Sequence, residues 1–242
     1  MQGGSIRLFR FAGIEVFLHF SWFLVAIYQL TSRPHGYLSP VFAVYEYLAL
    51  FFIVLLHEFG HAFACRQVGG IANRILLWPF GGVAFVRPPP RPGAELWSIV
   101  AGPLVNVALI PVLALLQLYL GRSSLIAHVP DSHRLIVMIG YINIIILVFN
   151  LLPIYPLDGG QILRSLLWFV VGRSKSLQIA SVVGLAGGVL ITLYAFRSGS
   201  VLFVVLTLFL LSQAIAGWQH ARALRLQEDE AARVDAPGPP VL

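Results

Sequence analysis

Charged residues are scarce in this 242-residue chain. Asp, Glu, Lys and Arg make up 11% of the residues, whereas hydrophobic residues make up 58% and the mean hydropathy is +0.85. Soluble domains usually carry about 25% charged residues, so this composition excludes an ordinary soluble domain and indicates an integral membrane protein. The formal net charge is +6, but the basic residues are spread over loops and form no stripe with stacking aromatics. Nucleic-acid binding is therefore not expected.

Cysteine is almost absent, since Cys65 is the only one. One cysteine forms no internal disulfide and no cysteine-based metal cluster, and we interpret Cys65 as a small buried apolar thiol. A cleavable signal peptide is not expected either, because no small-residue cleavage site follows the first apolar stretch. The sequence shows no internal repeat, which argues against a transporter fold built from inverted halves.

What the chain does have is long hydrophobic runs. Crossing a bilayer takes about 17 to 25 apolar residues, and six segments qualify: 14–30, 40–64, 95–120, 135–152, 177–196 and 201–218. A shorter apolar segment, 162–171, is expected to be a half-helix embedded in the membrane. The sequence therefore predicts an all-α polytopic membrane protein with six transmembrane helices in a single domain over residues 1–218. A polar tail, 219–242, is expected to be partly disordered.

The basic residues predict the orientation of these segments. Cytoplasmic loops near spanning segments are enriched in Lys and Arg. A cytoplasmic N-terminus places most of the 16 basic residues in cytoplasmic loops. We therefore expect both termini in the cytoplasm, the plasma membrane as the location, and the end of the second segment on the cytoplasmic side.

A short β-hairpin is expected between the second and third helices. Residues 75–86 hold two short apolar runs around Gly81-Gly82, a pattern typical of a membrane-associated hairpin with a glycine turn. Two roles stay open: a structural plug over the helix ends, or a free edge that pairs with an extended peptide by strand addition.

The strongest chemical signal is His57-Glu58-Phe59-Gly60-His61, near the end of the second apolar segment. Residues four apart share a face of a helix, so both imidazoles can reach one zinc ion, with Glu58 beside them as general base toward the zinc-bound water. The alternative is a pair of hydrogen-bonded core histidines. That arrangement would have to bury two imidazoles and a carboxylate among apolar helices without a metal.

A catalytic zinc ion takes three protein ligands, so a third donor is needed. Asp158 is the best candidate, because Pro153, Pro156 and Gly159-Gly160 let a non-helical stretch present its carboxylate. The alternative role for Asp158 is to cap the short helix that follows. Three other acids rank lower because they lie near segment ends: Glu15, Glu46 and Glu95.

Four motifs together resemble the site-2 protease family, the intramembrane zinc metalloproteases of peptidase family M50. They are HEFGH at 57–61, PFGGVA at 79–84, AGPLVN at 101–106 and NLLPIYPLDGG at 150–160. The resemblance implies that one Zn²⁺ per chain is held by His57, His61 and Asp158, with Glu58 as catalytic base. It also implies that Asn150 holds the scissile carbonyl or its oxyanion, and we interpret Asn106 as structural.

This resemblance implies a function. We expect hydrolysis of a peptide bond in or next to a transmembrane segment of a membrane protein substrate, within the lipid bilayer, by a compact form without PDZ or CBS domains. The alternative is a membrane zinc transporter or metal-sensing protein, because intramembrane His and acidic residues also mark ion pathways. Homo-oligomerisation is left open.

Overall fold

The structure, a computed structural model, describes residues 4–32, 36–78, 81–122, 129–199 and 201–234. The chain forms two compact units, Met1–Asn150 and Leu151–Leu242, and each is considered by itself. The single membrane domain over residues 1–218 stays a prediction.

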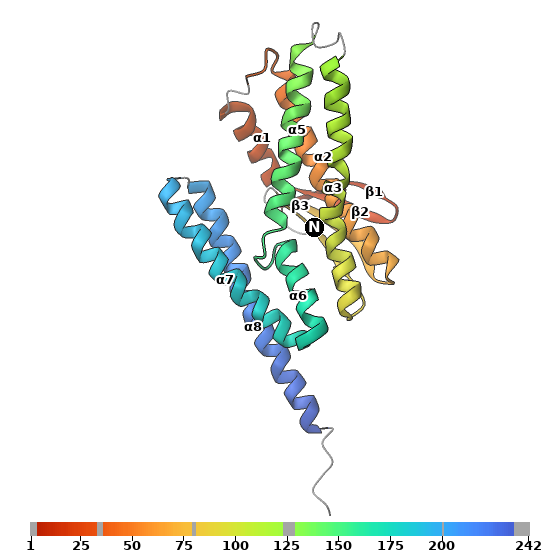
Figure 1. The fold of residues 1–242 in the computed structure, drawn as a ribbon, viewed down its shortest axis with the longest axis vertical. Helices are drawn as coiled ribbons and strands as arrows, with labels where there is room; N and C mark the ends of the chain where they lie inside the picture. Colours follow the sequence, from red (N-terminus) through yellow and green to blue (C-terminus); the bar gives the residue numbers. More distant parts are fainter. Residues whose placement is uncertain (1–3, 33–35, 79–80, 123–128, 200, 235–242) are drawn as a thin grey trace, which may run out of the picture. The chain divides into compact units, whose positions relative to one another are not determined.

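The N-terminal unit contains a four-stranded sheet with the order β1-β2-β3-β4 (Figure 1). Strands β1 (Ser5–Phe11) and β2 (Ile14–His19) form an antiparallel hairpin. Ala12 and Gly13 connect them, with φ of 47° and 76°. Two residues with positive φ form the hairpin turn whose twist matches that of the strands, so this turn fixes the register of β1 on β2.

Strand β3 (Ile71–Trp78) runs parallel to β2 and antiparallel to β4 (Gly81–Arg87), which leaves β4 at an edge of the sheet. The β3–β4 pair is the hairpin expected from the sequence. Its glycines do not form the turn, however, because Gly81 pairs with Trp78 and Gly82 with Leu77 inside the ladder. The connection consists of residues 79 and 80, which lie outside the described residues.

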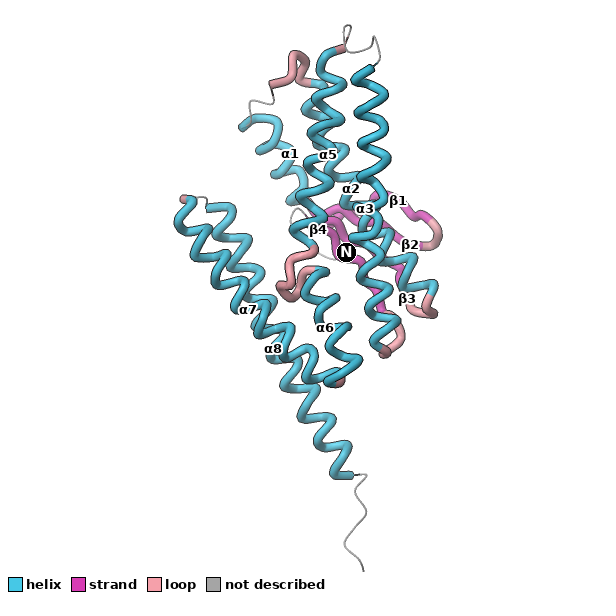
Figure 2. Tube along the Cα trace, in the orientation of Figure 1, coloured by secondary structure: helices cyan, strands magenta, loops and turns pink. Residues whose placement is uncertain are grey.

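The described residues of this unit also form four helices: α1 (Ser21–Ser32), α2 (Val41–Gln67), α3 (Pro92–Arg122) and α5 (Pro130–Asn150). Helices α2, α3 and α5 pack against one another, and β3 and β4 lie against α2 (Figure 2). The sheet packs against the C-terminal half of α2. This half of the helix carries His57 and His61.

An apolar core joins the sheet to α2. Alternate strand residues point to the same face, and on the face toward α2 these are Ile14 and Val16 of β2 and Ile75 and Leu77 of β3, all fully buried. They belong to one cluster with five residues of α2: Val54, Leu55, Phe59, Ala62 and Cys65. Because these α2 residues surround His57 and His61 in sequence, packing of the sheet holds this stretch of helix in place.

The C-terminal unit is helical. It contains α6 (Asp158–Val171), α7 (Arg173–Ser198) and α8 (Val201–Val234), with α7 packed along α8 and α6 against α7 (Figure 1). The expected half-helix at 162–171 is present as α6, which begins earlier, at Asp158. The tail expected after residue 218 continues α8 to Val234, and residues 235–242 lie outside the described part.

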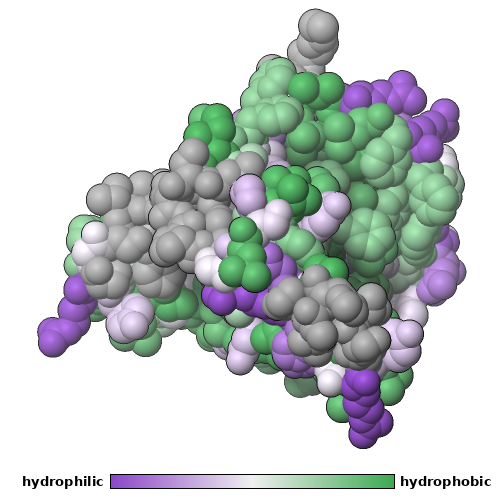
Figure 3. Space-filling view, turned by 90° about the horizontal axis from the view of Figure 1, so that it is seen from above, coloured by the Kyte–Doolittle hydropathy of each residue, from purple (hydrophilic) through white to green (hydrophobic). Residues whose placement is uncertain are grey.

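Four helical segments are long and apolar enough to cross a membrane among the described residues: Val41–Gln67, Pro92–Arg122, Asp131–Asn150 and Arg173–Arg197. Many large apolar side chains on them face outward, including Leu115, Ile145 and Leu190. Broad hydrophobic areas of this kind are visible in the space-filling view (Figure 3). Such a surface suits contact with lipid rather than water.

The predicted fold class is thus confirmed only in part. The protein is mostly helical, but it contains a mixed four-stranded sheet instead of a lone hairpin. Residues 14–30 do not form the expected first span, because they divide into β2 and the 12-residue α1. A helix of this length extends about 18 Å, less than the roughly 30 Å hydrocarbon core. Residues 201–218 are helical within α8, and their crossing of the membrane stays a prediction.

Candidate metal centre

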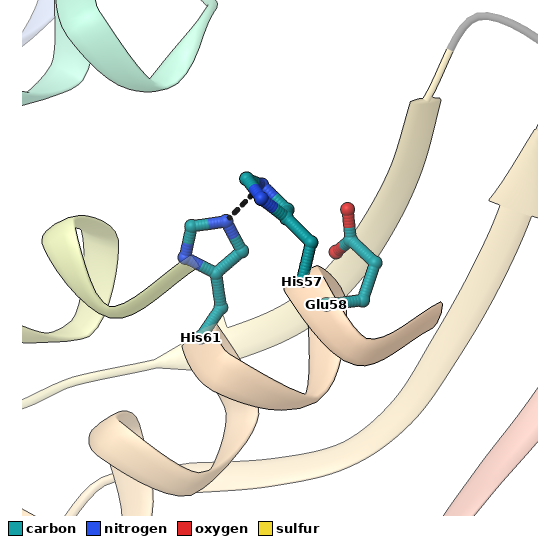
Figure 4. Close-up of side chains that lie close together, drawn as sticks. All are labelled: His57, Glu58 and His61. Carbon is teal, nitrogen blue, oxygen red and sulfur yellow. Dashed lines mark hydrogen bonds between the residues drawn. The ribbon is translucent and has the colours of Figure 1, made fainter. Parts of the chain in front are cut away.

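Helix α2 places His57, Glu58 and His61 close together in the interior of the N-terminal unit. The three side chains are 3%, 5% and 7% exposed, and their ligand atoms lie within 4.8 Å of one another. Both imidazoles project from the same side of α2 (Figure 4), as expected for residues four apart. We refer to these three residues as the metal centre.

The spacing of the two imidazoles fits a shared metal ion. Nε2 of His57 lies 3.0 Å from Nε2 of His61. Two nitrogens about 2.0–2.1 Å from one tetrahedral zinc ion lie about 3.3 Å apart. The two rings therefore need to separate by only a few tenths of an ångström to hold one ion through their Nε2 atoms.

The opposite nitrogen of each ring is held by α3. Nδ1 of His57 donates a hydrogen bond of 2.6 Å to Oδ1 of Asn106, and Nδ1 of His61 donates one of 2.9 Å to the main-chain oxygen of Ser98. An acceptor at Nδ1 places the ring proton there and leaves Nε2 as the metal-binding nitrogen. Helix α3 thus selects the tautomer of both histidines.

Close approach of α3 to α2 depends on glycines. A Cβ added at Gly102 would lie 2.8 Å from Nε2 of His57 and closer still to the ring of His61, and a Cβ at Gly60 would lie 2.7 Å from the main-chain oxygen of Ala101. These distances are too short for a real side chain. The Ala101-Gly102-Pro103 part of the AGPLVN motif therefore provides the space that the imidazoles occupy.

Glu58 lies beside the two histidines, on the β4 side of the metal centre (Figure 4). Its Oε2 accepts a hydrogen bond of 2.8 Å from the main-chain N–H of Ala84. Gly82 lies against the Glu58 side chain so closely that a Cβ there would overlap with it. The absence of a side chain at Gly82 therefore lets β4 pass directly against the carboxylate.

The third predicted ligand, Asp158, lies in the other unit. It is the first residue of α6, it is buried, and Leu157 rather than Asp158 occupies the N-cap position. A carboxylate in the first turn is favoured by the helix dipole. Asn150 is the half-buried last residue of α5. The ligand role of Asp158 and the catalytic role of Asn150 both stay predictions.

Two of the competing acids have partners elsewhere. Glu15 pairs with Arg7 at 3.5 Å across the β1–β2 hairpin, and Oε2 of Glu46 accepts a hydrogen bond from the Tyr37 hydroxyl.

Cys65 is buried, as expected, and its Sγ faces the main-chain oxygen of Ile71. Among the described residues, the His57, Glu58 and His61 group alone brings three such side chains together.

Sequence reasoning missed the role of Asn106, which was interpreted as structural. The residue is fully buried and contacts His57 directly. One signal was present: a polar amide in the middle of an apolar membrane segment is unfavourable unless it has a specific partner. A second buried amide, Asn143 of α5, carries the same signal.

Comparison with known proteins gives a consistent result. The family model for peptidase family M50 matches residues 45–134 and 125–194. The chain is similar to a zinc metalloprotease of Methanocaldococcus jannaschii, with 32% identity over 207 residues that cover 85% of this chain and 58% of that protein. It is also similar to stage IV sporulation protein FB of Bacillus subtilis, with 33% identity over 154 residues that cover 62% of this chain and 46% of that protein.

A solved structure is similar as well. The site-2 protease from Methanocaldococcus jannaschii has a TM-score of 0.61 and 28% identity, covering 88% of this chain and 95% of that one. By contrast, the chain spans less than two thirds of the length of both curated relatives.

Proposed function

Because this chain belongs to peptidase family M50, we propose that it is an intramembrane zinc metalloprotease that hydrolyses a peptide bond in or next to a transmembrane segment of a membrane protein. The observation that carries the proposal is the buried metal centre within α2, a helix apolar enough to cross the membrane. The relative from Methanocaldococcus jannaschii is named as a zinc metalloprotease, and nothing in the comparisons supports the alternative of a zinc transporter.

Zinc fits the donors that are present. His57 and His61 supply two imidazole nitrogens, and we assign the third position to Asp158, since a catalytic site of this type uses two histidines and a carboxylate. These residues would hold a zinc ion, which when bound would lower the pKa of a water molecule to about 7 and would polarise the scissile carbonyl. Asp158 belongs to a stretch of chain separate from α2, so zinc binding by this set of ligands would require the folded protein.

The chain's own residues move the proton. Glu58 is adjacent to both histidines, and it accepts the proton of the attacking water and returns it to the leaving nitrogen. The Ala84 N–H holds one of its oxygens, which limits the rotation of the carboxylate. We assign Asn150 to the developing negative charge on the carbonyl oxygen, where a side-chain amide can donate.

The edge strand β4 offers a place for an extended substrate. A helix hides its peptide carbonyls in hydrogen bonds, so a transmembrane substrate must be unwound before it is cleaved. Among the described strands β4 pairs with β3 alone, and its Ala84 N–H donates to Glu58. A substrate strand added to this edge would run past the catalytic base.

We also propose the predicted orientation, with the sheet side and both termini in the cytoplasm of a cell whose plasma membrane holds the protein. In the N-terminal unit, basic residues concentrate at the sheet end: Arg7, Arg10, Arg66, Arg74, Arg87 and Arg91. Fewer described ones, Arg122 and Arg134, occupy the other end of the helices. This asymmetry supports a cytoplasmic sheet.

The test compares wild-type protein with Glu58→Gln in proteoliposomes that contain a library of single-span transmembrane peptides. The wild type is expected to release fragments whose new termini, identified by mass spectrometry, lie in or next to the apolar segment. Glu58→Gln should reduce cleavage by about 10²- to 10⁴-fold and retain the metal. Equal cleavage by both proteins would contradict the proposal.

A further inference from the structure

Two buried amides connect α5 to the metal centre. Asn106 of α3 and Asn143 of α5, which we call the amide pair, are both fully buried. Nδ2 of Asn106 donates to Oδ1 of Asn143 at 2.8 Å, and Nδ2 of Asn143 donates to the main-chain oxygen of Asn106 at 2.9 Å. Oδ1 of Asn106 then accepts from Nδ1 of His57 at 2.6 Å.

One atom sets the direction of this whole chain of hydrogen bonds. The main-chain oxygen of Asn106 only accepts, so the atom of Asn143 that faces it must be Nδ2. Oδ1 of Asn143 therefore faces Asn106, and the facing atom of Asn106 must be its own Nδ2. The remaining atom, Oδ1 of Asn106, is the one presented to His57.

No other orientation satisfies the buried groups. If the Asn106 amide turned over, its oxygen would face the oxygen of Asn143. If both amides turned over, the oxygen of Asn143 would face the main-chain oxygen of Asn106. Each case places two buried acceptors against each other, and an unsatisfied buried polar group is costly.

The orientation matters because it decides which nitrogen of His57 can bind a metal. An oxygen at Nδ1 requires a proton there, so Nε2 has its lone pair directed at the metal position. An amide NH₂ group at Nδ1 would instead favour the tautomer with the proton on Nε2, which cannot bind a metal through that atom.

We propose that Asn143 is a positioning residue of the metal centre: through Asn106, it fixes the tautomer of His57 that binds zinc. This inference rests on the proposed zinc site. Asn143 also lies seven residues before Asn150, which in a helix is nearly two turns and the same face. The contact that orients His57 therefore also fixes the rotation of the α5 face that carries Asn150.

The test measures zinc affinity by chelator competition and the visible spectrum of the cobalt-substituted protein, neither of which needs a substrate. Asn143→Leu, which removes both hydrogen bonds at similar volume, should weaken zinc binding about 3- to 10-fold, less than the roughly 10- to 100-fold loss typical of a direct partner of a ligand. It should also change the cobalt spectrum.

A packing control and a second background separate this role from helix packing. Leu147→Ala removes a buried α5 side chain one turn away and should lower thermal stability without changing zinc affinity. Asn106→Asp presents an oxygen to His57 in either orientation, so adding Asn143→Leu to it should have no further effect on affinity.

The proposal is overturned if Asn143→Leu binds zinc as tightly as the wild type, if Leu147→Ala weakens binding equally, or if Asn143→Leu acts undiminished in the Asn106→Asp background. His57→Ala distinguishes this failure from failure of the zinc site itself. If His57→Ala leaves zinc binding unchanged, both this inference and the proposed metal centre are wrong.

Discussion

The main-chain N–H of Ala84 donates a hydrogen bond of 2.8 Å to the Glu58 carboxylate, which joins an edge strand of the sheet to the proposed catalytic base. The contact is possible because Gly82, two residues earlier in β4, has no side chain to occupy the same space. The position of the carboxylate therefore depends on the strand as well as on α2.

Gly82→Ala should reduce cleavage by about 10-fold or more, because general-base catalysis depends on the position of the carboxylate. Zinc content should not change, since the atoms nearest to the added Cβ all belong to Glu58 and not to either histidine. The matched control is Gly121→Ala, where an added Cβ meets nothing within 4 Å and activity should be retained. Full activity of Gly82→Ala would show that β4 does not constrain Glu58.

Gly102→Ala should abolish stoichiometric zinc binding. The new methyl group would occupy the space between the imidazoles of His57 and His61, while alanine itself favours the helix by about 0.8–1.0 kcal/mol over glycine. The measurement is zinc per chain by elemental analysis, with Gly140→Ala of α5 as control because its Cβ meets nothing within 4 Å. A zinc-replete Gly102→Ala protein would contradict the assigned metal position.

Asp158→Asn should lower zinc occupancy, because an amide is a weaker zinc ligand than a carboxylate. Asp131→Asn is the matched control. Asp131 is also a buried carboxylate in the first turn of its helix, and it accepts hydrogen bonds from the main-chain N–H groups of Leu38 and Ser39. Equal zinc content in the wild type and both variants would argue for a purely structural Asp158.

Tyr37→Phe should remove a pH-dependent part of the stability. Burial raises the pKa of Tyr37 above its ordinary value, and its hydrogen bond to Glu46 raises it further. A raised folded pKa gives stability that is fully present below the unfolded value of about 10 and is lost as the pH rises from there through the folded pKa.

Thermal unfolding in detergent at pH 8 and pH 11 measures this effect. At pH 8 the wild type should exceed Tyr37→Phe by about 0.5–1.5 kcal/mol, the net value of one hydrogen bond. At pH 11 the difference should shrink. Arg134, which lies over the ring of Tyr37, can still contact phenylalanine, so a difference that stays constant with pH would assign the effect to packing instead.

The spacing of His57 and His61 was readable from the sequence because residues four apart meet on any helix. The same holds for α3, α5 and α7, whose apolar length alone predicts a helix. Contacts between residues far apart in the sequence could not be predicted. Asn106 lies 49 residues after His57, and only the packing of α3 on α2 makes them neighbours.

The first predicted span failed for a different reason. Residues 14–30 are apolar enough for a membrane helix, but Ile14 and Val16 are β-branched and alternate with residues on the other face of β2. The turn at Ala12-Gly13 was the local signal for a hairpin. Hydropathy averaged over a span-length window hides this alternation, and the parallel pairing of β2 with β3 depends on a segment more than 50 residues away.

X-ray absorption at the zinc edge of the purified, zinc-loaded protein tests the central claim most directly. The account predicts two imidazole nitrogens and otherwise oxygen donors at about 2.0–2.1 Å, with one imidazole lost in His61→Ala. A sulfur donor at about 2.3 Å, which could come only from Cys65 or a methionine, or a spectrum unchanged in His61→Ala, would contradict it.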